Sequence, residues 1–266
     1  MKEGGKILAE ILKKLSEAVR SGITTQDLEV LARELTKKAQ VKPAFLGYGG
    51  YPAALCTSVN DEVVHCEPSG RELKEGDLVS LDMGIVYKEF NLDSAVTVPV
   101  ISPIENAPVL SEPDDISGQH LPMGLNYKQW ARMNPKLHKL LVATKEALAA
   151  GVKEAKIGNR VGHISHAIQR VVESYGFSVV RELVGHGTGR ELHEEPQIPN
   201  FGKKTDGIVL QEGMVLAIEP MVTTGDWRVK KDPRGFAYRT VDGSYAAHFE
   251  HTVAITHNGS WILTLI

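Results

Sequence analysis

The sequence predicts an α+β fold in which two similarly ordered halves share one sheet. Helix-like apolar spacing is followed by short strand-like runs, and the same order begins again after residue 134. The 266 residues are 42% hydrophobic and 24% charged, which is typical of a globular domain. The two halves show no residue-by-residue repeat, so the prediction rests on the order of the elements.

The first half is expected to open with two helices. From Ile7 to Val19, apolar residues recur at three- and four-residue spacing and predict a helix over residues 1–20. Thr24 and Asp27 form a helix-start signal for a second helix. Turn-rich sequence then leads into β-rich runs, and the predicted strands cover residues 54–59, 78–87 and 94–100.

The second half repeats this order. Apolar stripes at helical spacing predict helices over residues 137–148 and 164–175. The strand-like runs that follow cover residues 177–183, 214–221, 236–241 and 248–256. Asp242 and Gly243 stand between the last two runs, where this dipeptide predicts a tight β-hairpin.

Residues 99–134 break the pattern, because they carry five prolines and little apolar periodicity. We interpret them as a Pro-rich insertion within a single catalytic domain that spans residues 1–266. A surface excursion without a role in the chemistry is the main expectation. A cover over the site or a contact with the ribosome is the alternative.

Composition and charge exclude several classes of protein. The net charge of −3 gives no electrostatic reason to expect a nucleic acid as a specific partner. Cys56 and Cys66 are expected to be buried or pocket-lining thiols and not a disulfide scaffold. No stretch approaches the roughly 20 apolar residues that span a bilayer, so no membrane role is expected. Residues 1–20 resemble an amphipathic helix and not a signal peptide, which makes the cytoplasm the expected location.

Acidic residues inside apolar strand-like runs are the most informative feature of the sequence. Asp82, Glu219 and Glu250 each occupy such a run. A buried carboxylate must be paired, protonated or bound to a metal, since leaving it ionised alone costs on the order of several kcal/mol. Arginine partners are an alternative, but lysine and arginine cluster on the predicted helices and loops. Asp93 follows Asp82 at a spacing that suits two adjacent antiparallel strands with both carboxylates in one place.

His186 is the fifth candidate ligand, because the glycines on either side of it permit close backbone approach. The four carboxylates balance the charge of two divalent cations, and a neutral imidazole adds none. Two such ions about 3.5–4 Å apart are a recurring arrangement for hydrolysis. Each residue taken singly is better explained as a structural acid or histidine, whereas the set of five favours a metal centre.

Five segments, in this order along the chain, resemble type I methionine aminopeptidases of the bacterial kind, within the peptidase M24 family. The segments are VNDEVVH (59–65), GDLVSLD (76–82), GHGTGRELHEEP (185–196), IEPM (218–221) and FEHT (249–252). The resemblance runs from Lys6 to Leu263, apart from residues 99–134.

The resemblance implies the pita-bread fold with pseudo-two-fold symmetry. It also implies hydrolytic removal of the initiator methionine from nascent proteins with a small second residue. The implied metal ligands are Asp82, Asp93, His186, Glu219 and Glu250, with Asp82 and Glu250 holding or bridging both ions of a pair. Manganese, iron, cobalt, nickel and zinc all suit such a site. A monomer with transient ribosome contact is the further expectation.

The resemblance also implies roles for residues around the ligands. His65 and His193 would contact the substrate and the tetrahedral intermediate, while Glu219 would carry the proton. The methionine side chain would occupy a soft apolar pocket. The implied lining of this pocket is Tyr48, Tyr51, Cys56, Leu192 and Phe236.

Two other functions stay open at this point. An Xaa-Pro peptidase of the same fold uses a similar ligand set, although that group usually carries a separate amino-terminal domain. A non-catalytic binding protein on this scaffold is the other alternative, although all five ligand positions hold competent residues. The departures from the family pattern leave the second-residue preference open. They are Gly49 where relatives often have histidine, Asn91 and Leu92 before Asp93, and His248 in place of a frequent glutamine.

Overall fold

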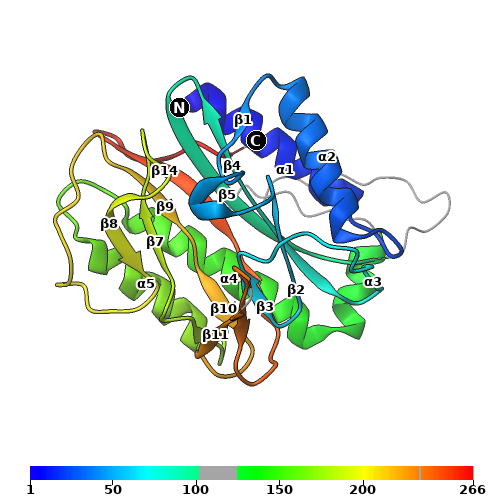
Figure 1. Cartoon of the computed structure of the whole chain (residues 1–266). Coiled ribbons are helices and arrows are strands. Elements are labelled where there is room, and N and C mark those ends of the chain that lie inside the picture. Colours follow the sequence, from blue (N-terminus) through cyan, green and yellow to red (C-terminus); the bar gives the residue numbers. More distant parts are fainter. Residues whose placement is uncertain (102–124, 234, 266) are drawn as a thin grey trace.

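The computed structural model describes residues 1–101, 125–233 and 235–265, and these form an α+β structure with helices against a curved sheet (Figure 1). The helices are α1 (Lys2–Ala18), α2 (Thr25–Lys38), η1 (Tyr48–Gly50, a single 3₁₀ turn), α3 (Leu125–Met133), α4 (Pro135–Glu154) and α5 (Val161–Ser174). The predicted α+β class is confirmed.

The strands form one large sheet and two small ones, in which neighbouring strands pair antiparallel. Strands of the first half are β1 (Lys42–Pro43), β2 (Cys56–Val59), β3 (Glu62–Val64), β4 (Leu78–Tyr87) and β5 (Phe90–Pro99). Strands of the second half are β6 (Ser178–Val179), β7 (Val184–Gly187), β8 (Glu194–Pro199), β9 (Val215–Ile218), β10 (Met221–Thr223), β11 (Val229–Lys231), β12 (Tyr238–Thr240), β13 (Ala246–His248), β14 (Glu250–Thr256) and β15 (Gly259–Ile262).

The large sheet joins the two halves of the chain. Its order is β1-β4-β5-β14-β9-β7-β8, with β2 beside β4 and β15 beside β14. Strands β5 and β14 form the junction, where Glu250 pairs with Ala95 and His251 with Ser94. The prediction that two halves share one sheet is therefore confirmed.

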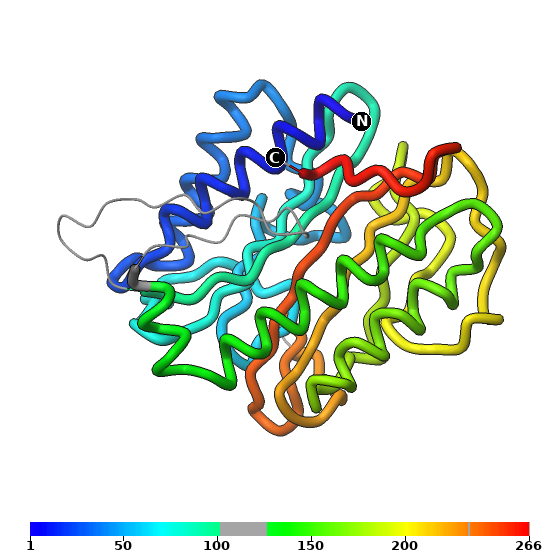
Figure 2. Tube along the Cα trace, turned by 180° about the vertical axis from the view of Figure 1, so that it is seen from behind, coloured from blue at the N-terminus to red at the C-terminus, as the bar shows by residue number. Residues whose placement is uncertain are grey.

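Helices cover the face of this sheet that is seen from behind in Figure 2, where α1, α4 and α5 cross in front of the strands. Helix α1 packs on β4 and β5, and α4 packs on β9 and β14. Leu8, Leu12 and Leu15 of α1 are buried, as are Leu141 and Leu148 of α4. This apolar layer fixes one face of the sheet, which leaves the opposite face for the polar site.

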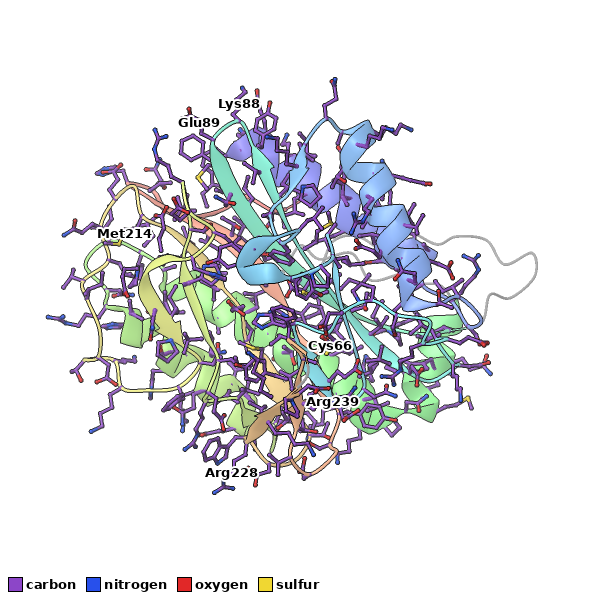
Figure 3. All side chains as sticks on the ribbon, in the orientation of Figure 1. Cys66, Lys88, Glu89, Met214, Arg228 and Arg239 are labelled. Atoms are coloured by element: carbon purple, nitrogen blue, oxygen red, sulfur yellow. The ribbon has the colours of Figure 1, made fainter. Side chains whose placement is uncertain are left out.

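Local sequence explains how the first elements begin and end. The Thr24 side chain caps α2 by accepting from the Asp27 N–H, while the Asp27 carboxylate accepts from the Thr24 N–H at 2.8 Å. Strands β4 and β5 form a hairpin whose turn contains Lys88 at a φ of +58° and Glu89, at the edge of the molecule in Figure 3. The expected antiparallel pair that carries Asp82 and Asp93 is thus confirmed.

Two expectations about local structure are wrong. Asp242 and Gly243 form a turn, but not a β-hairpin: β12 before them pairs with β3 and β11, and β13 after them pairs with β10. The Asp242 carboxylate instead accepts from the N–H groups of Asp226 and Ser244. In the run 177–183, only Ser178–Val179 forms a strand.

The Pro-rich segment is only partly within the described residues, because 102–124 lie outside them. Pro99 ends β5, and α3 covers nine residues near the segment's end. Tyr127 and Trp130 of α3 are buried in the main core, so this part of the segment is packed structure. Within the described part of the chain, none of the helices is both long and apolar enough to cross a lipid bilayer.

Candidate metal centre

The register of the large sheet brings acidic side chains to one face. Asp82 pairs with Ala95, and Ala95 pairs with Glu250, so the three residues form one row across β4, β5 and β14. Side chains that pair directly lie on the same face, and the small Ala95 leaves room between the two carboxylates. Asp93 lies two residues from Ala95 along β5 and therefore shares that face.

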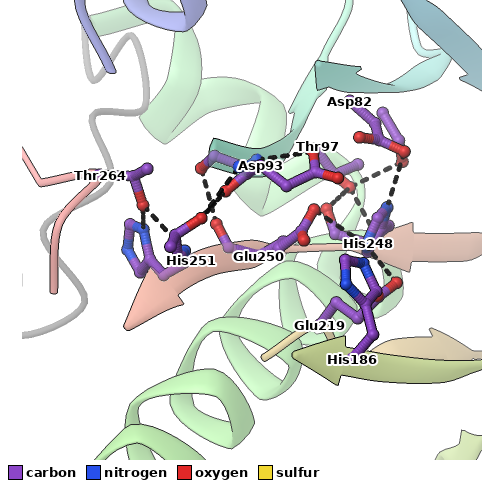
Figure 4. Close-up of polar contacts among 12 residues, drawn as sticks. Asp82, Asp93, Thr97, His186, Glu219, His248, Glu250, His251 and Thr264 are labelled. Atoms are coloured by element: carbon purple, nitrogen blue, oxygen red, sulfur yellow. Dashed lines mark hydrogen bonds and ion pairs between the residues drawn. The ribbon is translucent and has the colours of Figure 1, made fainter. Parts of the chain in front are cut away.

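The second half of the chain completes the cluster. His186 pairs with Ala217 of β9, and Ala217 pairs with Thr252 of β14. This second row places the His186 imidazole on the face that Glu250 occupies, because Thr252 is two residues from Glu250. Glu219 directly follows β9, two residues after Ala217. Figure 4 shows these side chains converging from both halves.

The distances are short enough for shared ligation. Asp93, His186 and Glu250 each offer one ligand atom, and these atoms lie within 4.8 Å of one another. His186 Nε2 lies 3.6 Å from Glu219 Oε1. The carbonyl of Gly187, 2.8 Å from His186 Nδ1, can only accept, so Nδ1 carries the proton and Nε2 offers a lone pair to the cluster.

The glycines beside His186 are required by close backbone contacts. A Cβ at Gly185 would lie 2.4 Å from the Ala217 carbonyl oxygen, and one at Gly187 would lie 2.3 Å from the Glu195 carbonyl oxygen. Real Cβ atoms do not approach backbone oxygens so closely. The prediction that these glycines permit close approach is confirmed.

Among the ion pairs of the described residues, those of Asp82 and Glu219 are with histidines and not with lysine or arginine. The Asp82 Oδ1 atom is buried and has no hydrogen-bond partner. Three buried carboxyls, the partly exposed carboxyl of Glu219 and a buried imidazole lone pair are the donor set that one or two divalent cations need. These residues fit such ions well.

Burial and mutual repulsion shift the pKa values of the cluster. Burial raises the pKa of Asp93 to about 7. Burial, together with repulsion from neighbouring carboxylates, also raises the pKa values of Asp82, Glu219 and Glu250. Burial lowers the pKa of His186 to about 4, which keeps its imidazole neutral near pH 7.

His248 belongs to this cluster, although the sequence analysis treated it only as a departure from the family pattern. Its side chain is 1% exposed, and Nε2 lies 3.5 Å from Glu219 Oε2 and 4.0 Å from Glu250 Oε2. Nδ1 lies 4.0 Å from Asp82 Oδ2. The available signal was its position two residues before Glu250, because alternate residues of an extended chain share a face.

A cavity of about 220 Å³ opens onto the cluster. All five pocket residues expected from the sequence line it: Tyr48, Tyr51, Cys56, Leu192 and Phe236. Phe45 also lines it and was missed. Phe45 follows β1 and is 9% exposed. Neither periodicity nor a motif distinguishes it from an ordinary core residue.

His65 and His193 stand where the cavity meets the carboxylates. Both line this cavity and also a neighbouring one of about 390 Å³, which shares His186 and Glu219 with the first. The ring centroids of His186 and His193 are 4.2 Å apart. His193 Nδ1 lies 2.8 Å from the Tyr48 hydroxyl, a contact that sequence reasoning did not foresee.

Comparison with known sequences gives matches over nearly the whole chain. The sequence profile of metallopeptidase family M24 matches residues 1–112 and 122–257. The chain is 44% identical over 266 residues to the methionine aminopeptidase of Clostridium acetobutylicum, which covers 100% of this chain and 94% of that protein. It is 42% identical over 266 residues to methionine aminopeptidase 1 of Bacillus subtilis, covering 100% and 95%.

Solved structures agree with these matches. The crystal structure of methionine aminopeptidase from Thermotoga maritima aligns with a TM-score of 0.86 at 46% identity, covering 100% of this chain and 95% of that one. The prolidase of Pyrococcus horikoshii aligns with a TM-score of 0.67 at 23% identity, covering 99% and 60%, a likeness of fold alone. The pita-bread fold that the resemblance implied is confirmed.

Proposed function

The chain belongs to metallopeptidase family M24, and from this and the site we infer that it removes the N-terminal methionine of proteins by metal-dependent hydrolysis. One observation carries the inference: an apolar cavity sized for one side chain ends at a cluster of buried carboxylates and histidine. The high identity to methionine aminopeptidases over the full chain supports the same activity. The likeness to prolidases is limited to the fold, so the Xaa-Pro alternative is disfavoured.

We further propose that Asp82, Asp93, His186, Glu219 and Glu250 hold two divalent ions. Four carboxylates then balance the charge of the pair. The ligand atoms of Asp93, His186 and Glu250 lie within 4.8 Å of one another, so these three residues would together hold one ion of the pair. Bound there, divalent ions supply Lewis-acid polarisation and a lowered pKa of water.

The cavity supports binding of a methionine side chain. Tyr51, Cys56, Leu192 and Phe45 are all at most 9% exposed and pack together in one apolar cluster. The Phe236 ring meets the Tyr51 ring edge-on, with centroids 5.4 Å apart. An unbranched thioether suits such a rigid aromatic slot, whereas a charged or β-branched side chain leaves unpaired polar groups or empty space.

The side chains around the carboxylates supply the proton steps. We propose that Glu219 accepts a proton from the attacking water and returns it to the amine that forms when the peptide bond breaks. His193 donates a hydrogen bond to the oxygen of the scissile carbonyl, and His65 orients the peptide beside the new amine.

Tyr48 is proposed to fix the tautomer of His193. When the Tyr48 hydroxyl donates to Nδ1, the ring proton sits on Nε2, where it serves as a donor to the substrate oxygen. Tyr48→Phe keeps the ring and removes only the hydroxyl. We expect kcat to fall about three- to tenfold, the equivalent of one hydrogen bond, with metal content unchanged. Steady-state assays that show an unchanged kcat and a raised KM would instead assign Tyr48 to binding alone.

Nascent polypeptides in the cytoplasm are the proposed substrates, and a monomer is the proposed working form. The lysine pairs at 203–204 and 230–231 are exposed, as contact with ribosomal RNA requires. Co-sedimentation with ribosomes at rising salt measures this contact, and it is expected to weaken when the four lysines are replaced by glutamine.

The activity itself is tested by competing peptides. Purified protein supplied with Mn²⁺ or Co²⁺ is expected to release methionine from Met-Ala-Ser and to leave Ala-Pro intact. Norleucine in place of methionine tests the pocket, because it has the same shape without sulfur, and it should be cleaved more slowly. Preferential cleavage of the Ala-Pro peptide would overturn the proposal.

A further inference from the structure

His248 is a buried imidazole that the proposed mechanism does not use. It ends β13, and its main chain is held in place because its N–H donates to the Thr97 hydroxyl at 2.8 Å, while that hydroxyl contacts the His248 carbonyl. The side chain is 1% exposed, and neither ring nitrogen has a hydrogen-bond partner among the described residues. A neutral imidazole has one N–H that donates and one nitrogen that accepts a hydrogen bond. Both ring nitrogens of His248 therefore call for a bonding partner that the described residues do not supply.

The neighbours of the ring are the carboxylates of the cluster. Nε2 faces Glu219 Oε2 at 3.5 Å and Glu250 Oε2 at 4.0 Å, and Nδ1 faces Asp82 Oδ2 at 4.0 Å (Figure 4). Glu219 thereby lies between two imidazoles, because its other oxygen is 3.6 Å from His186 Nε2. His248 therefore lies among the proposed ligands.

These separations are too long for direct hydrogen bonds, which span about 2.7–3.2 Å between N and O. They are the distances expected between two ligand atoms that bind the same cation. Ligand atoms bound at about 2.1 Å to the same ion lie roughly 3–4.2 Å apart, depending on the angle between them. Nε2 meets this condition with two oxygens at once, whereas Nδ1 meets it with one.

We propose that His248 is a sixth ligand of the metal centre and binds through Nε2 to an ion held by Glu219 and Glu250. This inference rests on the proposed two-ion site. With Nε2 bound, the remaining proton sits on Nδ1 and points toward Asp82, the arrangement in which a ligating histidine faces a carboxylate. The centre then has two nitrogen donors, one from each imidazole.

A second imidazole changes the preference of the site among metals. Nitrogen donors favour cobalt, nickel and zinc over manganese and magnesium, which prefer oxygen. His248→Gln replaces the ring with an amide of similar reach. We expect this variant to bind one of its two Co²⁺ ions at least about tenfold more weakly in competition with a chelator, with a smaller change for Mn²⁺.

Proton NMR of the Co²⁺-loaded protein counts the bound imidazoles directly. Each ligating ring gives one strongly shifted N–H signal that exchanges with water. The wild type is expected to show two such signals, one from Nδ1 of His186 and one from Nδ1 of His248. His248→Gln should show one. A wild type with one signal and a spectrum equal to that of His248→Gln would overturn the proposal while leaving the five-ligand site intact.

Controls separate this outcome from other failures. His251→Gln alters a buried histidine whose Nδ1 lies 2.8 Å from the Thr264 hydroxyl, away from the cluster, and should retain both signals. A wild type with no shifted N–H signal would contradict the proposed metal centre and this inference together. If His248→Gln does not fold, wild type labelled with ¹⁵N-histidine gives the count alone.

Discussion

Asp93→Asn is expected to lower kcat/KM for a methionyl peptide by about 10³-fold or more. The variant keeps the shape of the side chain and removes one of the four charges that two divalent ions require. Asp93 lies within reach of His186 and Glu250, so its loss disturbs the ion position that these three residues would share. Metal analysis after dialysis should find no more than one ion per chain.

The same substitution should stabilise the ion-free protein. Burial raises the pKa of Asp93 to about 7, which means that its ionised form is unfavourable in the folded state. Removing that charge relieves repulsion among the remaining carboxylates. At pH 8 the ion-free variant should therefore unfold at a higher temperature than the ion-free wild type. Loss of activity with a gain in stability distinguishes a ligand from a structural residue.

Glu89→Gln is the matched control. Glu89 belongs to the turn of the same β4–β5 hairpin, where it pairs with Arg190 at 2.9 Å, and both side chains are 71% exposed. Exposed ion pairs of this kind contribute little to the free energy of unfolding. Activity, metal content and unfolding temperature should all stay within error of the wild type. An Asp93→Asn variant that behaves like this control would contradict the proposed ligand role.

Metal removal is expected to destabilise the protein more at pH 8.5 than at pH 6.5. The raised pKa values of Asp82, Asp93, Glu219 and Glu250 mean that the ion-free folded chain holds more protons than the unfolded chain in this interval. Its free energy of unfolding therefore falls as the pH rises. Bound divalent ions need ionised carboxylates and reverse this trend.

The buried histidines of the cluster do not contribute to this difference. Burial lowers the pKa values of His186 and His248 to about 4 and about 3, so both rings stay neutral in the folded protein throughout this interval. Their titration in the unfolded chain affects the proteins with and without ions equally and cancels from the difference. Calorimetry with EDTA and with excess Mn²⁺ measures the two unfolding temperatures. Their difference should widen by about 5 °C or more between pH 6.5 and 8.5. A constant difference would show that these carboxyls do not titrate with ion binding.

The fold was predictable from the sequence where local signals dominate. Strand β4 was predicted with its observed bounds, because its apolar run lies between a turn at Gly76 and a polar turn at Lys88. Strand β5 begins four residues before its predicted start, at Phe90, since the polar Asn91 and Asp93 hid the strand pattern. The side-chain amide of Asn91 donates hydrogen bonds to the carbonyls of Gly189 and Arg190. Only the folded chain brings these carbonyls close to Asn91.

Other features depend on distant partners. The residues around Asp242 have the local sequence of a hairpin turn. However, β12 before them pairs with β3, and β13 after them pairs with β10. The place of His248 in the cluster depends on Glu219, which β9 brings from the other side of β14. Phe45 lines the cavity because β1 lies beside β4. The spacing of residues within one segment cannot predict contacts with segments that are distant in the sequence.

Anomalous diffraction from crystals grown with Co²⁺ tests the central claim most directly. The account predicts two peaks at the cobalt edge, within about 4 Å of each other, among the carboxylates of Asp82, Asp93, Glu219 and Glu250. The Nε2 atom of His186 should lie at bonding distance from one of them. The absence of a peak between these side chains, at an ion concentration that restores activity, would contradict the account.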